Sequence, residues 1–284
     1  MYSIYHFFEH LVANKSVLQT VNKLGSFPFA AGMLSCQSDG KFPDLAIKIN
    51  SDRSLFTGGE LVELKDSVSY TVSSFNSTIP TGTKEIRKVI TGENSAIRRQ
   101  MEEAGDDIES LPLRDVFYLV RGKKKNYTKV ALVHGSFFET IKSNSLISQS
   151  FEQVLNERLQ ESGLDIGGSV KDLLVDIFSE QESFSKVRSV DKASVKLRFR
   201  IMTEVKAEGN ILNPKKYPDI LDNTINLIIP CHQKQDEALT VRRFSTVFDL
   251  SQFRQFTIKH HLNGNFTVFQ QNFVNHNSMQ SNEN

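Results

Sequence analysis

Two short segments of the chain hold carboxylates and a lysine at a spacing suited to phosphodiester hydrolysis. Asp44 follows Pro43 at the start of an alternating apolar run, and Glu63 and Lys65 lie two residues apart in a second run. Residues two apart on a strand project to the same face of a sheet. Glu63 and Lys65 would therefore present a carboxylate and an ammonium group to one spot. We predict that Asp44, Glu63 and Lys65 form a catalytic centre.

The chemistry of these residue types points to a magnesium site. Phosphodiester hydrolysis requires that charge on the phosphate oxygens be neutralised and that a water molecule be activated. Mg²⁺ prefers oxygen ligands and usually takes one or two protein carboxylates, while water and phosphate complete its shell. We expect Asp44 and Glu63 to supply the carboxylates and the Leu64 backbone carbonyl to be a third ligand. Lys65 would orient or deprotonate the attacking water, and an arginine at this position would stay charged and could not take the proton.

Two strands joined by a hairpin would position these residues. Residues 44–50 alternate, with Leu45, Ile47 and Ile49 on one face, and residues 50–53 have the composition of a turn. Residues 60–65 form the second predicted strand, which follows two glycines. In a regular strand Glu60 lies on the face opposite Glu63, and Asp66 likewise opposes Lys65, so neither is expected as a primary ligand.

Together, residues 42–47 (FPDLAI) and 58–65 (GGELVELK) resemble the motif of the PD-(D/E)xK nuclease superfamily, whose fold most type II restriction endonucleases share. The resemblance covers about a tenth of the chain. It implies a mixed α+β fold with a central mixed β-sheet flanked by helices. It also implies a Mg²⁺-dependent, site-specific endonuclease that acts on double-stranded DNA as a homodimer. In this family an acidic residue on an early helix often joins the metal site, and Glu9 is the candidate here.

Polar and basic residues beyond the motif are candidates for DNA contact. Residues 67–83 form a long loop rich in serine and threonine, and residues 84–103 have the pattern of a charged helix. A basic turn over residues 122–125 follows Arg121, and Arg98 and Arg99 add charge to the helix. Such side chains can bond phosphates or base edges. The predicted DNA-binding residues are Ser73, Ser74, Asn76, Ser77, Thr78, Lys84, Arg87, Lys88, Lys123, Lys124 and Lys125.

The composition of the chain is that of an ordinary globular protein. The 284 residues include 34 Lys and Arg against 33 Asp and Glu, so any basic surface must be local. Cys36 and Cys231 lie far apart and have no metal-ligand or disulfide spacing. The sequence contains no signal-peptide core and no apolar run of about 18 residues, so we predict a cytoplasmic protein without membrane contact. It also lacks zinc-protease, nucleotide-binding and serine-hydrolase motifs, which excludes a nucleotide cofactor from the prediction.

The remaining sequence predicts one nuclease domain over residues 1–274, with a catalytic core of about 1–135, an elaboration of about 136–274 and a polar tail of 275–284. Helices are expected at residues 4–24 and at 137–178 with a break near 163–168. Strands are expected at residues 116–120, 129–134 and 194–206.

A second Glu-x-Lys pair and two alternative functions also have to be considered on the sequence alone. Glu204 and Lys206 repeat the Glu-x-Lys spacing, but without a preceding Pro-Asp pair we expect them to be surface charges. The chain could also be a repair nuclease of the same fold that recognises DNA structure. In a noncatalytic DNA-binding or assembly protein, Asp44, Glu63 and Lys65 would only be a polar sheet face.

Overall fold

The computed structural model describes residues 2–23, 26–36, 42–49, 58–70, 72, 80–90, 95–124, 127–139, 143–179, 184–188, 194–198, 212, 215–231 and 234–273. The chain divides into two compact units. The first contains Met1–Val72, Pro80–Phe138 and Glu208–Asn284, and the second contains Ser73–Ile79 and Glu139–Ala207. The sequence predicted that the core ends near residue 135. The first unit does break off after Phe138, but it also takes in the chain from Glu208 onward.

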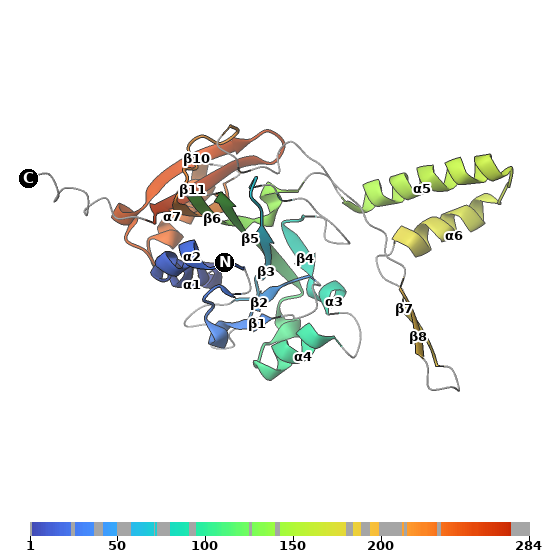
Figure 1. Cartoon of the computed structure of the whole chain (residues 1–284), viewed down its shortest axis with the longest axis horizontal. Coiled ribbons are helices and arrows are strands. Elements are labelled where there is room, and N and C mark those ends of the chain that lie inside the picture. The colour runs from blue at the N-terminus through green and yellow to red at the C-terminus, as the bar shows by residue number, and fades with distance from the viewer. Residues whose placement is uncertain are drawn as a thin grey trace, which may run out of the picture. The chain divides into compact units, whose positions relative to one another are not determined.

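The first unit is built on a mixed β-sheet (Figure 1), which has nine strands among the described residues. The strands run in the order β1 (Leu34–Cys36), β2 (Leu45–Ile47), β3 (Leu61–Asp66), β5 (Leu113–Lys124), β6 (Tyr127–His134), β9 (Thr224–Pro230), β11 (Gly264–Asn272) and β10 (Arg254–His260). Strand β4 (Thr83–Glu85) pairs with β5. The pairs β3–β5 and β6–β9 are parallel and the others antiparallel.

Helices cover the sheet and bury two separate apolar clusters. Helices α1 (Tyr2–Ala13), α2 (Lys15–Thr20) and α7 (Lys234–Phe244) contribute to a cluster that includes Val62 and Phe117. Helices α3 (Ile86–Val89) and α4 (Ala96–Glu103) contribute to the other cluster, which includes Leu61 and Val116. Successive strand residues point to opposite faces, so these clusters define an α1 face and an α4 face of the sheet. The predicted mixed α+β fold, with a central mixed sheet flanked by helices, is confirmed.

The α1 face explains why the N-terminal pattern forms helix. Ile4, Phe7, Phe8 and Leu11 recur at helical spacing and are fully buried. Burying each such side chain contributes about 1.5–3 kcal/mol before entropy is counted.

The first unit also contains short 3-10 helices, which are η2 (Ala31–Met33), η3 (Ile108–Ser110), η4 (Gly135–Phe137) and η5 (Leu250–Gln252).

The second unit contains helices α5 (Ser143–Ser162) and α6 (Gly168–Ser179) and a two-stranded sheet of β7 (Phe184–Arg188) and β8 (Ser194–Arg198) (Figure 1). The two helices and the break between them agree with the pattern predicted for residues 137–178. Strand β8 covers the start of the predicted strand at 194–206. Glu204, Lys206 and the tail at 275–284 lie outside the described residues. Of the helices in the described part of the chain, none is both long and apolar enough to cross a membrane.

Candidate active site

Strand pairing brings Asp44 beside Glu63. In the antiparallel β2–β3 pair, Leu45 lies opposite Val62 and Ala46 opposite Leu61. One step further along this register Asp44 is level with Glu63, and opposed residues of an antiparallel pair share a face. Because Leu61 belongs to the α4 face, Glu63 and Lys65 lie on that face as well.

The backbone of β3 fixes the Asp44 carboxylate. The Leu64 amide donates a hydrogen bond to Asp44 Oδ2 over 2.8 Å. Pro43 is the residue level with Leu64 in this register. The Leu64 N–H donates to the Asp44 carboxylate, which takes the place of the backbone carbonyl that would accept this bond in a continued ladder. Leu64 presents its carbonyl on the same strand edge as its N–H. The ligand role of this carbonyl beside Asp44 stays a prediction.

Lys65 and Glu63 form a close ion pair. Lys65 Nζ lies 2.9 Å from Glu63 Oε1. The Glu63 side chain is only 10% exposed, whereas that of Lys65 is 28% exposed and so retains access to solvent. The three residues of the predicted centre thus lie together, with the acid of the Glu-x-Lys pair buried and its base nearer the surface.

Lys84 is a second lysine at this site, and sequence reasoning placed it on the wrong element. It was predicted at the start of a charged helix, but it lies on β4, opposite Arg114 of β5. Its Nζ lies 4.3 Å from the centre of the Phe42 ring, two residues before Asp44. The charges of Lys84 and Glu63 attract each other, which favours the charged form of both groups. Lys84 therefore contributes to the electrostatics of the acidic pair.

Burial makes the two carboxylates unusually basic. It raises the pKa of Asp44 above 3.8, although the Leu64 hydrogen bond and Lys65 oppose the shift. Burial also raises the pKa of Glu63 above 4.5; Lys65 lowers it, and the neighbouring Asp44 charge raises it again. Burial lowers the pKa of Lys84 from 10.5. Two desolvated carboxylates side by side favour either a proton or a cation between them.

One oxygen of Glu63, Oε2, is buried and has no hydrogen-bond donor among the described residues. A buried carboxylate oxygen without a donor costs free energy that a bound cation would recover. No group of three or more His, Cys, Asp or Glu residues that could hold a metal occurs within the described ranges. The candidate is thus a two-carboxylate site that water and substrate would complete.

The raised pKa of Glu63 gives a stability prediction for the metal-free protein. The folded state holds this proton to a higher pH than the unfolded state does, so the contribution of Glu63 to stability falls as pH rises from 4.5 through its raised pKa. We expect Glu63→Gln to be more stable than wild type near neutral pH in chelator, with the difference shrinking as pH falls into that window. Urea unfolding at several pH values measures this. A difference that is constant with pH would contradict the raised pKa.

Other acidic residues near the motif lie on the α1 face or at the surface. Glu60 is buried and accepts a hydrogen bond from the Ser3 hydroxyl of α1. Asp66 pairs with Arg121 at 2.9 Å. Both therefore lie as predicted, away from the face of Glu63 and Lys65. Glu9 was the candidate for a further ligand, but it is exposed on α1, and its Oε2 lies 3.1 Å from His6 Nδ1. Because α1 packs on the opposite face of the sheet, the structure does not bring Glu9 to the carboxylate pair.

The predicted DNA contacts are only partly placed. Arg87 and Lys88 are exposed on α3 and pair with Glu109 and Glu85 respectively. Lys123 and Lys124 belong to β5, which extends through most of the predicted basic turn. Ser73, Ser74, Asn76, Ser77, Thr78 and Lys125 lie outside the described residues.

Arg121 and Arg98, two basic residues near the predicted DNA contacts, each bond to other parts of the chain. Arg121 is buried, because its guanidinium bonds Asp66 and the Val21 and Asn22 carbonyls. It therefore ties β5 to the end of α2 and is not part of an exposed basic turn. Arg98 bonds Glu102 one turn further along α4.

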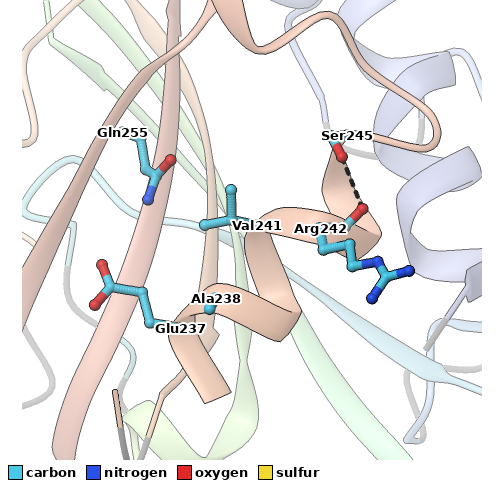
Figure 2. A pocket seen from close by; sticks show the side chains of 6 residues that line it. All are labelled: Glu237, Ala238, Val241, Arg242, Ser245 and Gln255. Atoms are coloured by element: carbon cyan, nitrogen blue, oxygen red, sulfur yellow. Dashed lines mark hydrogen bonds between the residues drawn. The ribbon is translucent and has the colours of Figure 1, made fainter. Parts of the chain in front are cut away.

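A separate pocket lies between α7 and β10 (Figure 2). It has a volume of about 620 Å³ and is lined by Glu237, Ala238, Val241, Arg242, Ser245 and Gln255. The Ser245 hydroxyl is bound to the Arg242 carbonyl at 2.8 Å, within the same helical turn. Glu237 accepts a hydrogen bond from Thr257 of β10. The Thr257 contact joins α7 to β10 at the edge of the sheet. The pocket lining contains no residue of the Asp44 site.

No family model, no curated protein and no solved structure matches this chain.

Proposed function

We propose that the chain is a Mg²⁺-dependent endonuclease that hydrolyses phosphodiester bonds of double-stranded DNA, a type II restriction enzyme of the PD-(D/E)xK kind. The observation that carries the proposal is the desolvated pair of Asp44 and Glu63 on adjacent strands, with Lys65 bound to Glu63. This arrangement provides hard anionic ligands and a solvent-accessible amine in one place.

Asp44 and Glu63 would hold the metal, and the unpartnered Glu63 Oε2 fits this role. Bound Mg²⁺ would neutralise phosphate charge and favour ionisation of a water molecule. The Leu64 amide keeps Asp44 in place through its 2.8 Å hydrogen bond. The pair is thus held by β3 backbone and does not depend on a flexible loop, which suits a site that must keep its geometry during catalysis.

The two lysines would have different tasks. Lys65 is partly exposed and within hydrogen-bond distance of Glu63. As an ammonium group it would orient the attacking water, and in its neutral form it would take the proton of that water. Lys84 is half-buried against the Phe42 ring, where its positive charge would offset the acidic pair. Neither role requires the chain to change its fold.

Digestion of mixed plasmid DNA tests the proposed activity. We expect cleavage with Mg²⁺ and none in excess chelator, because the carboxylates alone perform little of the chemistry. Ca²⁺ should support DNA binding without cleavage, since it accepts looser and higher coordination than Mg²⁺. Discrete fragments favour a sequence-specific enzyme, whereas cleavage of branched DNA alone would favour the repair nuclease. Full cleavage in chelator, or none with any divalent cation, would contradict the proposal.

A further inference from the structure

The β7–β8 ribbon of the second unit, residues 184–188 and 194–198, separates its residues into two chemically different faces. The antiparallel register sets Lys186 opposite Lys196, Arg188 opposite Ser194, and Phe184 opposite Arg198. Because opposed residues share a face and strand residues alternate, one face holds the positions of all four basic residues of the two strands. This face consists of Lys186, Arg188, Lys196 and Arg198 together with Phe184 and Ser194. The other face holds the positions of Ser185, Val187, Val195 and Leu197.

The opposed lysine positions are expected to lower the stability of the isolated ribbon. Like charges directly opposite each other on an antiparallel pair destabilise it, and Lys186 and Lys196 occupy such positions. The sheet has two strands among the described residues, and a two-stranded hairpin is only marginally stable in water. Lysines on exposed strand edges can discourage aggregation, but a directly opposed pair goes beyond that need. A polyanion bound to this face would offset the repulsion, because each lysine would be attracted to it.

Charge is also segregated along the second unit. Residues 143–179, which include α5 and α6, contain six acidic and two basic residues. Residues 184–198 contain five basic residues and one acidic residue. A polyanion that meets this unit would therefore be attracted to the ribbon and repelled by the helices.

We propose that the basic face of the β7–β8 ribbon binds the phosphate backbone of duplex DNA. Lys186 and Arg188 lie two residues apart, about 7 Å along the strand, a length over which one DNA strand carries about two phosphates. A two-stranded ribbon also fits the major groove. The choice of DNA over another polyanion rests on the proposed function. The contact itself is with phosphate and carries no sequence information.

The salt dependence of DNA binding tests this contact. Each neutralised phosphate adds about 0.9 to the slope of log affinity against log salt. We expect the Lys186→Gln/Lys196→Gln double variant to bind a fluorescent 30-bp random duplex more weakly, with a slope smaller by about 2. The full-length protein is titrated in Ca²⁺, so that cleavage does not interfere. Lys186→Arg/Lys196→Arg keeps both charges and should retain the wild-type slope.

A matched control removes two positive charges from helices α5 and α6 of the same unit. Arg158 and Lys171 lie on α5 and α6 and pair with Glu161 and Glu152, so Arg158→Gln/Lys171→Gln should leave the slope unchanged. An unchanged slope in the lysine-to-glutamine variant, or an equal loss in this control, would overturn the proposal. A smaller slope in Lys186→Arg/Lys196→Arg together with a lower melting temperature would also overturn it, because that pattern indicates that the two lysines have a structural role.

The same titration separates this inference from the proposed nuclease. One outcome is a salt-dependence slope of DNA binding that is smaller in Lys186→Gln/Lys196→Gln than in wild type, while no metal supports cleavage by wild type. In that case the DNA contact stands and the nuclease assignment fails. If wild type cleaves DNA with Mg²⁺ and the ribbon variant binds with the wild-type slope, the nuclease stands and the ribbon inference fails.

Discussion

Asp44→Asn and Lys65→Met should each slow DNA cleavage by at least about a hundredfold. Asparagine can still accept the Leu64 hydrogen bond but loses the charge that would hold a cation. Methionine keeps most of the volume of the lysine stem but cannot orient or deprotonate water. Single-turnover rates on a DNA fragment that wild type cuts measure both effects, and melting temperatures show whether each variant is folded.

Glu60→Gln is the matched control for these variants. Glu60 is a buried carboxylate next to β3, three residues before Glu63, but it bonds Ser3 on the α1 face. We expect its cleavage rate to remain near that of wild type. If Glu60→Gln abolished cleavage while Asp44→Asn cut normally, the site would lie on the other face of the sheet.

Asp106→Ala should cost about 3–5 kcal/mol of the free energy of unfolding. Asp106 and Arg114 form an ion pair at 3.2 Å in which both side chains are fully buried. Asp106 also accepts a hydrogen bond from the Ile49 amide at 3.0 Å, just beyond β2. Removing the carboxylate leaves the Arg114 charge buried and its donors without their anion. Urea unfolding with linear extrapolation measures the change.

An exposed ion pair provides the comparison. Arg87 and Glu109 lie 2.9 Å apart, and their side chains are 77% and 58% exposed. Glu109→Ala should therefore change the free energy of unfolding by no more than about 1 kcal/mol. Equal effects of Asp106→Ala and Glu109→Ala would show that the buried pair is not a major stabilising contact.

The strands of the candidate site could be predicted because local sequence determines them. Leu45 and Ile47 alternate with smaller or polar residues, and Leu61 and Val62 begin a second apolar run after two glycines. The period of two then puts Glu63 and Lys65 on one face without knowledge of the rest of the fold. Only the antiparallel register had to be added to bring Asp44 level with Glu63.

The positions of Lys84 and Glu9 depended on contacts distant in sequence. Residues 84–103 have helical periodicity, but pairing with β5 draws Thr83–Glu85 into a strand before α3 begins. The helix containing Glu9 was predicted correctly, yet nothing in its own sequence tells which sheet face it covers. That choice depends on the match between its apolar stripe and the α1 face.

The ribbon shows the same division between local and nonlocal information. The alternation from Ser194 onward predicts a strand, and β8 is found there. Its partner β7 is five residues long, and its lysine is not distinctive in sequence. Only the register shows that Lys186 and Lys196 oppose each other and that the cations share a face.

The most direct test of the proposed nuclease is a Mg²⁺ titration of single-turnover cleavage by wild type and Glu63→Gln. Glu63 provides the buried oxygen without a hydrogen-bond partner among the described residues, so the substitution removes the charge at the point where a cation is expected. We predict a wild-type rate that saturates with Mg²⁺, and a rate at least about a hundredfold lower in Glu63→Gln at every concentration. Equal rates and equal Mg²⁺ dependence in the two proteins would contradict the assignment of the site.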